Sequence, residues 1–137
     1  MELLQAIPSA RMIAAAFLAI LFLQSGIDKI VDWKGNLTWL QDHFKNSPLK
    51  NMVPANLGII TFLELLTGIV SGVGLVMLIV DGSTDFAMVG AQLAGLSLVM
   101  LFFGQRVAKD YEGAATLISY ASFVLIAIIL FSDFTSA

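Results

Sequence analysis

The sequence feature that most constrains the fold is a glutamate inside a long apolar run. The run extends from Asn56 to Val80, and Glu64 is its one ionisable residue. At about 1.5 Å per residue, a helix of this length crosses a hydrocarbon layer about 30 Å thick with a slight tilt. A carboxylate at that depth is unstable unless it is paired, hydrated or protonated. We therefore expect Glu64 to face other helices and not lipid.

One face of this segment is suited to close contact between helices. Its residues recur at spacings of three and four: Thr61, Glu64, Gly68, Ser71, Gly72 and Leu75. Gly68 and Gly72 form a G-x-x-x-G pair, which lets a second helix approach closely. The opposite face consists of Ile, Leu, Val and Phe, side chains that suit lipid. The pattern predicts a helix packed on one side and exposed to the bilayer on the other.

Composition places the chain among integral membrane proteins. Of its 137 residues, 58% are apolar and 12% charged, and the mean hydropathy is +0.91, whereas an ordinary soluble domain carries about 25% charged residues. The lipid bilayer is therefore its first expected partner. A net charge of −3 argues against nucleic acid as a partner, because nucleic acid selects for clustered Lys and Arg.

The chain contains few residues that hold cofactors. It has no cysteine, so a disulfide, an iron–sulfur cluster and a catalytic thiol are excluded within it. Its one histidine, His43, is too few for a bis-histidine haem or a His-rich metal site. We predict no metal site and no cofactor bound by protein ligands of these kinds. The motifs of soluble hydrolases and nucleotide-binding enzymes are also absent.

Apolar segments alternate with polar turns along the whole chain. They predict a single all-α domain over residues 1–137, an integral membrane four-helix bundle with helices at about 10–30, 54–80, 86–104 and 114–131. Gly26 in the first helix, and Gly90 and Gly95 in the third, are expected to serve helix packing. The third helix also embeds an amide, Gln92, which we expect to hydrogen-bond to a neighbouring helix.

The connector between the first two apolar helices has an amphipathic stretch. Its apolar residues recur at four, three and four: Trp33, Leu37, Leu40 and Phe44. Tryptophan favours the membrane interface, since its ring is apolar while its N–H stays wet. The pattern predicts a short amphipathic interfacial helix between helices one and two, with His43 as a solvated residue on it.

The distribution of basic residues suggests an orientation. The two long connectors carry Lys29, Lys34, Lys45, Lys50, Arg106 and Lys109, whereas the opposite side has Arg11 alone. By the positive-inside rule, the connectors face the cytoplasm and both termini lie outside.

Lys29, near the end of the first helix, is a candidate partner of Glu64. One interpretation makes Lys29 an interface anchor whose stem reaches water. The other turns Lys29 inward toward Glu64, about 12 Å deep along the second helix. In that arrangement Lys29, Glu64, Ser25 and Gln92 are candidate ligand-binding residues for a molecule with a polar head and an apolar tail, such as a quinone or a lipid.

Glu64 also has a purely structural interpretation. A protonated Glu64 would hydrogen-bond to Thr61, Thr67, Gln92 or a backbone carbonyl and fix helix packing. The functional interpretation makes Glu64 the candidate catalytic residue, because ionisable groups inside a membrane span commonly mark functional sites.

Two blocks of sequence resemble the DoxX family of small four-helix membrane proteins. They are FLQSGIDK at residues 22–29 and FLELLTGIVSG at residues 62–72. The family's Ser-Gly-x-x-Lys and Glu-Leu-x-x-Gly motifs correspond to Ser25, Gly26 and Lys29, and to Glu64, Leu65 and Gly68. The resemblance implies a bacterial inner-membrane protein related to subunits of quinone-linked oxidoreductases, such as thiosulfate:quinone oxidoreductase and a terminal quinol oxidase. DoxX relatives are usually drawn with cytoplasmic termini, opposite to the orientation that the basic residues predict.

The function expected from these observations is that of a multi-pass, non-redox accessory subunit of a larger membrane assembly, beside a quinone site. Its protein partners would be other membrane subunits or copies of itself. One alternative is a quinone-linked oxidoreductase subunit in which Glu64 accepts a proton. Another is a small transporter or a lipid-binding protein. The sequence does not decide whether the chain is itself an enzyme.

Overall fold

The computed structural model describes residues 5–132, which are almost entirely helical. The elements are α1 (Ala6–Val31), α2 (Trp33–His43), the short 3-10 helix η2 (Lys50–Met52), α3 (Val53–Asp81), α4 (Asp85–Val107) and α5 (Tyr111–Phe131). Residues 5–132 contain no strand. The predicted all-α class is therefore confirmed.

Four of these helices, α1, α3, α4 and α5, are long and apolar enough to cross a membrane. They coincide with the four predicted apolar segments, and each begins one to four residues earlier than expected. Together they indicate a multi-pass membrane protein that sits in a lipid bilayer.

Local chemistry fixes the turns that join these helices. Gly82 follows α3 with φ 74°, a left-handed conformation that glycine adopts without a steric penalty. At the start of α5, Asp110 Oδ1 accepts a hydrogen bond from the Gly113 N–H at 3.0 Å. This N-cap satisfies a helix-terminal donor, so α5 begins at Tyr111 and not at the expected position near 114.

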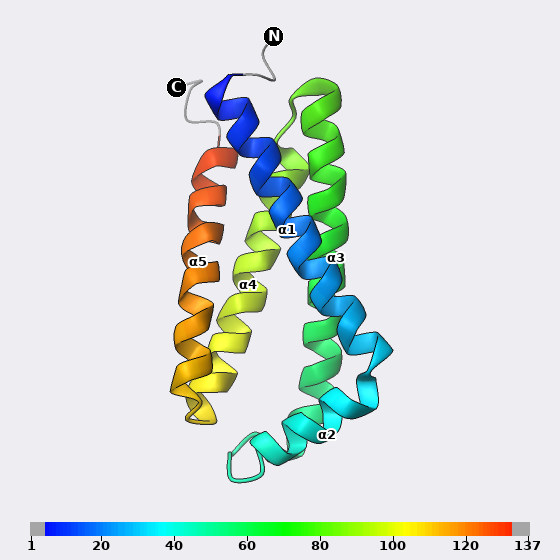
Figure 1. The fold of residues 1–137 in the computed structure, drawn as a ribbon, viewed down its shortest axis with the longest axis vertical. Coiled ribbons are helices and arrows are strands. Elements are labelled where there is room, and N and C mark those ends of the chain that lie inside the picture. Colours follow the sequence, from blue (N-terminus) through cyan, green and yellow to red (C-terminus); the bar gives the residue numbers. More distant parts are fainter. Residues whose placement is uncertain (1–4, 133–137) are drawn as a thin grey trace.

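The long helices pack in the order α1, α3, α4, α5, with α1 chiefly against α3. The start of α1 and the end of α5 lie at one end of the molecule, and α2 crosses the other end (Figure 1). At the first end, Arg11 Nε and Nη2 donate to the carbonyl oxygens of Leu130 at 2.5 Å and Ser132 at 3.2 Å. A cation there complements the unsatisfied carbonyls of a helix C-terminus.

Small side chains let the helices approach closely. The buried positions of α1 and α4 are dominated by Ala14, Ala15, Ala19, Ala87, Ala91 and Ala94. Such residues favour association inside a bilayer, where packing and not water exclusion drives helix contact.

Glycines mark the points of closest approach. A Cβ atom on Gly68 would lie 2.7 Å from the Leu23 backbone nitrogen of α1, and one on Gly26 would lie 2.7 Å from the Leu65 side chain of α3. On the other side of α3, a Cβ on Gly90 would overlap Ser71. Gly26, Gly68 and Gly90 therefore lie where two helices come within the reach of a single Cβ atom.

The predicted G-x-x-x-G contact is wrong in its second member. A Cβ on Gly72 would meet nothing within 4 Å. Gly95, on α4, instead faces α5, where a Cβ would make an ordinary contact with Val124 at 3.6 Å. At Gly72 the reason is that α1 runs obliquely across α3 (Figure 1), so the two backbones are closest over a short stretch. The second close approach of α3 is at Gly74, where a Cβ would lie 2.5 Å from the Ala87 nitrogen of α4.

Gly68→Ala should destabilise the protein, with Gly72→Ala as its matched control one helical turn away. We expect Gly68→Ala to lower the free energy of unfolding by about 1–3 kcal/mol, because the new methyl group overlaps the backbone of α1. Gly72→Ala should be neutral or stabilising by up to about 1 kcal/mol, because alanine favours the helix. Circular dichroism during unfolding in mixed micelles measures both. Equal stability of the two variants would contradict the close approach at Gly68.

Candidate functional site

The polar centre of the structure joins α1 to α3. Lys29 Nζ lies 2.8 Å from Glu64 Oε1. The same ammonium group donates to Ser25 Oγ at 2.9 Å, and Ser25 Oγ donates to Glu64 Oε2 at 2.6 Å. Lys29, Ser25 and Glu64 thus form a closed set of contacts, the polar triangle, in which both carboxylate oxygens have a partner.

Helix geometry explains why these three side chains meet. Ser25 and Lys29 are four residues apart on α1, so they share one helical face. Gly26, beside Ser25, brings α1 against α3 next to Glu64. Glu64 lies about 16 Å along α3 from its first residue, Val53. In the structure Lys29 thus points inward, toward Glu64.

Burial makes the pairing energetically necessary. The Glu64 side chain is 4% exposed and the Lys29 side chain 20% exposed. A buried carboxylate without a cation or hydrogen bonds is strongly disfavoured in a low-dielectric interior. Lys29 supplies the charge and Ser25 supplies a second donor, so the triangle as a whole is close to neutral.

The other predicted partners of Glu64 are engaged elsewhere. The Thr61 and Thr67 hydroxyls donate to carbonyl oxygens one turn earlier in α3, at 2.7 Å and 2.6 Å. The expected interaction of Gln92 with a neighbouring helix of the same chain is wrong, because the Gln92 side chain is exposed on α4 and makes no hydrogen bond within residues 5–132. The buried face of α4 consists instead of Ala87, Gly90, Ala91, Ala94, Ser97 and Leu98.

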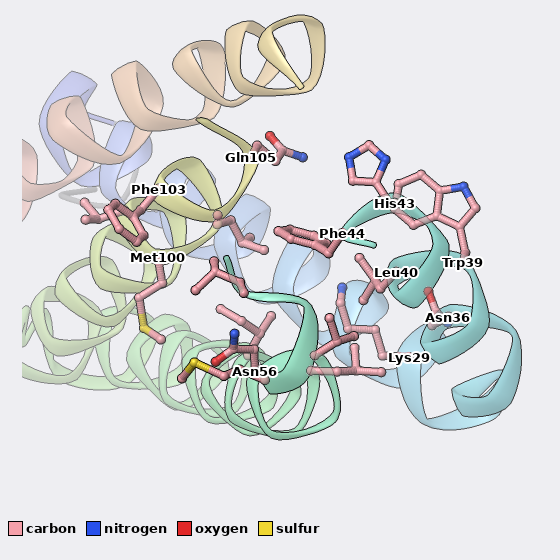
Figure 2. Close-up of a pocket in the computed structure, with 18 residues that line it drawn as sticks. Lys29, Asn36, Trp39, Leu40, His43, Phe44, Asn56, Met100, Phe103 and Gln105 are labelled. Carbon is pink, nitrogen blue, oxygen red and sulfur yellow. The ribbon is translucent and has the colours of Figure 1, made fainter. Parts of the chain in front are cut away.

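A cavity of about 640 Å³ lies beside Lys29 (Figure 2). Its walls come from the end of α1, from α2 and the loop after it, from η2 and the start of α3, and from the end of α4. Most lining side chains are apolar: Trp39, Leu40, Phe44, Leu49, Met52, Val53, Leu57, Ile60, Val99, Met100, Leu101 and Phe103.

Lys29 gives this cavity its distinctive polar point. Among the lining residues in the described part of the chain, it is the only Lys, Arg, Asp or Glu. Glu64 and Ser25 lie behind it and do not line the cavity. An ammonium group has three N–H donors, and the described residues provide acceptors for two of them. One donor is therefore available to a molecule in the cavity.

A second polar region of the cavity contains His43 and Gln105. His43 Nε2 and Gln105 Oε1 are buried and have no hydrogen-bond partner within residues 5–132. Figure 2 shows the two side chains near each other at one side of the cavity. Because buried polar atoms are normally satisfied, Gln105 Oε1 is suited to a polar group of a bound molecule or to water, whereas His43 Nε2 has the Asp110 carboxylate nearby.

His43 also connects α2 to the turn between α4 and α5. Its Nε2 lies 3.4 Å from Asp110 Oδ2, and its ring stacks on Trp39 with centroids 4.7 Å apart. With 27% of its side chain exposed, His43 is less solvated than the sequence suggested. The four-residue spacing of Trp39 and His43 was the signal that could have predicted the stacking, but the contact with Asp110 depends on tertiary structure.

Removing Lys29 should reveal how strongly Glu64 depends on it. We expect Lys29→Met to lower the free energy of unfolding by about 3–5 kcal/mol, because it leaves a buried carboxylate without its cation. Adding Glu64→Gln to that variant should recover much of the loss, since the amide is neutral and still accepts from Ser25. Chemical unfolding in micelles measures the free energy of unfolding of the unaltered protein, of Lys29→Met and of Lys29→Met/Glu64→Gln.

Lys34→Met, at an exposed position of α2, is the matched control for loss of a lysine. It should change stability by no more than about 0.5 kcal/mol. A Lys29→Met variant as stable as this control would contradict the structural role of the polar triangle.

Comparison with protein-family models, with curated proteins and with solved structures finds no match for the chain. The function is therefore inferred from the chemistry of the cavity and of the polar triangle.

Proposed function

We propose that the chain is a non-redox subunit of a larger membrane assembly and that its cavity binds the head of an uncharged amphipathic molecule, with a quinone as the best-fitting class. The observation that carries this proposal is the charge-balanced Lys29–Glu64 pair, of which Lys29 lines a mostly apolar cavity. A site of this kind offers a hydrogen-bond donor without a net charge.

Charge balance favours a carbonyl oxygen over a phosphate as the acceptor. The Lys29 charge is already compensated by Glu64 at 2.8 Å, so an anionic head group would enter a cavity without a free counter-charge. Burial of an unpaired charge is far more costly than burial of a neutral carbonyl that accepts one hydrogen bond. A ring that bears carbonyls meets these requirements, and the apolar walls suit its hydrophobic portion.

The position of the cavity supports entry from the membrane. Residues of α2 line the cavity, and α2 crosses one end of the molecule (Figure 1). This helix carries two exposed tryptophans, Trp33 and Trp39. We propose that the four long helices form a membrane-spanning bundle and that α2 lies in the interface. The head of the ligand would then sit near the membrane surface, with its tail directed toward lipid past the exposed Val99 and Phe103.

The resemblance of the Ser25 and Glu64 blocks to the DoxX family supports the same direction. It favours a bacterial inner membrane and a quinone-linked assembly. The basic connectors favour cytoplasmic placement of α2, with both termini outside. Since the sequence lacks cysteine and has one histidine, electrons would be carried by a partner subunit or by the quinone.

The alternative in which Glu64 accepts a proton directly from quinol has less support. Both Glu64 oxygens are engaged, by Lys29 and Ser25, and Glu64 does not line the cavity. The group that would touch a bound molecule is Lys29. If Glu64 were nevertheless the proton acceptor, Glu64→Gln would abolish turnover of the native assembly while leaving the assembly intact.

Quinone binding can be measured with the purified chain in nanodiscs of uncharged lipid. We expect a short-tailed quinone to quench tryptophan fluorescence in a saturable manner, because Trp39 lines the cavity. The double variant Lys29→Met/Glu64→Gln should weaken binding by about tenfold or more, since it removes the donor. Met100→Trp, which fills the cavity, should abolish saturable binding.

Lys34→Met is the control that should bind normally. Unchanged affinity in both Lys29→Met/Glu64→Gln and Met100→Trp would refute the site. Displacement of the quinone by anionic lipid would show instead that the cavity is a phosphate or lipid site. Catalytic reduction or oxidation of a quinone by the purified chain alone would contradict its assignment as a non-redox subunit.

A further inference from the structure

The outward face of α4 carries an amide where lipid contact is expected. Its exposed residues recur at three and four: Val89, Gln92, Leu96, Val99 and Phe103. The corresponding exposed face of α3 is entirely apolar: Ile59, Phe62, Ile69, Val73, Val76 and Val80. Contact with hydrocarbon accounts for the α3 face, but it does not account for Gln92.

The depth of Gln92 makes its exposure costly. It lies about 10 Å along α4 from the charged first residue, Asp85. Its amide has two N–H donors and a carbonyl acceptor, and hydrocarbon satisfies none of them. Gln24 is also exposed, on α1, but it lies only about 6 Å from the exposed Asp28 near the end of that helix. Gln24 can therefore reach polar surroundings more easily than Gln92.

We propose that a second copy of the chain packs its α4 against this face, so that Gln92 bonds to Gln92 of the partner subunit. An amide is both donor and acceptor, so it is complementary to itself. A two-fold axis along the membrane normal places every residue at the same depth as its own counterpart, and the contact closes on itself. No second kind of residue needs to be supplied at that depth.

The spacing of the face supports this mode of packing. Residues that alternate at three and four form a straight seam on a helix whose partner crosses at about 20°. A single polar residue in an apolar seam fixes the register of the two helices. Gln92 is that residue here, flanked by Val89 and Leu96.

The same face borders the cavity, because Val99 and Phe103 both belong to it and line the cavity. A second copy would therefore shield part of the cavity wall from lipid. The proposed dimer depends on Gln92 and not on the identity of the ligand. The proposals of a dimer and of quinone binding can therefore be tested independently.

The absence of cysteine in the sequence allows a direct test by disulfide crosslinking. Leu96→Cys introduces a thiol on the proposed seam, next to an intact Gln92. Ile69→Cys is the matched control on the exposed face of α3. Ile69 lies about 18 Å from the end of α3, and Leu96 lies about 16 Å from the start of α4, so the two positions are matched in depth. Both variants are reconstituted at a low ratio of protein to lipid and oxidised with copper phenanthroline.

We expect Leu96→Cys to form a covalent dimer at least about ten times faster than Ile69→Cys, because a seam near the two-fold axis holds the two thiols within the Cβ separation that a disulfide requires. Adding Gln92→Leu should weaken dimer association by about 3- to 20-fold. Unfolding in micelles will show that this variant still folds, since Gln92 makes no contact that the monomer requires.

Three results would overturn the proposal. Equal crosslinking of Leu96→Cys and Ile69→Cys would indicate random collisions. A crosslink from Leu96→Cys to a different protein in native membranes, without a dimer, would assign the face to another partner. An unchanged association constant in Gln92→Leu would show that the amide does not hold the two copies together.

Discussion

The pairing of Glu64 with Lys29 is the interaction on which the rest of the structure depends. A carboxylate about 16 Å along a membrane-length helix cannot remain there as an unpaired charge. The pair requires α1 and α3 to approach within the reach of one lysine side chain. Gly26 and Gly68 allow this approach, because a side chain at either position would collide with the other helix. Electrostatics and packing therefore specify the same contact, which is the most extensive between any two helices.

The chemical character of the cavity follows from this pair. Lys29 alone would create a cationic pocket suited to phosphate, but Glu64 and Ser25 behind it balance the charge and leave one donor facing the cavity. The surrounding Leu, Met and Phe side chains place this donor in a largely apolar setting, where a hydrogen bond to it would be stronger than in water. The residue that pairs with the embedded acid is therefore also the residue that presents a donor to the cavity.

The two ends of the molecule differ in how the helices are held. At one end Arg11 binds the final carbonyls of α5 and draws α1 and α5 together. At the other end α1 and α5 diverge (Figure 1), and α2 spans the space between them. His43 closes this side through its contact with Asp110. The cavity exists because the helices splay at the end where polar and aromatic side chains, rather than small ones, form the contacts.

The sequence by itself determined the helical class, the four membrane-length segments and the burial of Glu64, because apolar length and the cost of a charge in hydrocarbon are local properties. It also predicted that Lys29 could turn inward toward Glu64, since antiparallel neighbouring helices would place Lys29 near the membrane face from which the second helix starts. Tertiary structure decided the rest. In the folded protein Gln92 is exposed, and the second close approach of α3 is at Gly74, against α4, and not at Gly72. The cavity is lined by five segments. These features depend on the crossing angles and rotations of the helices. Such angles result from packing between helices, which the sequence of a single segment does not specify.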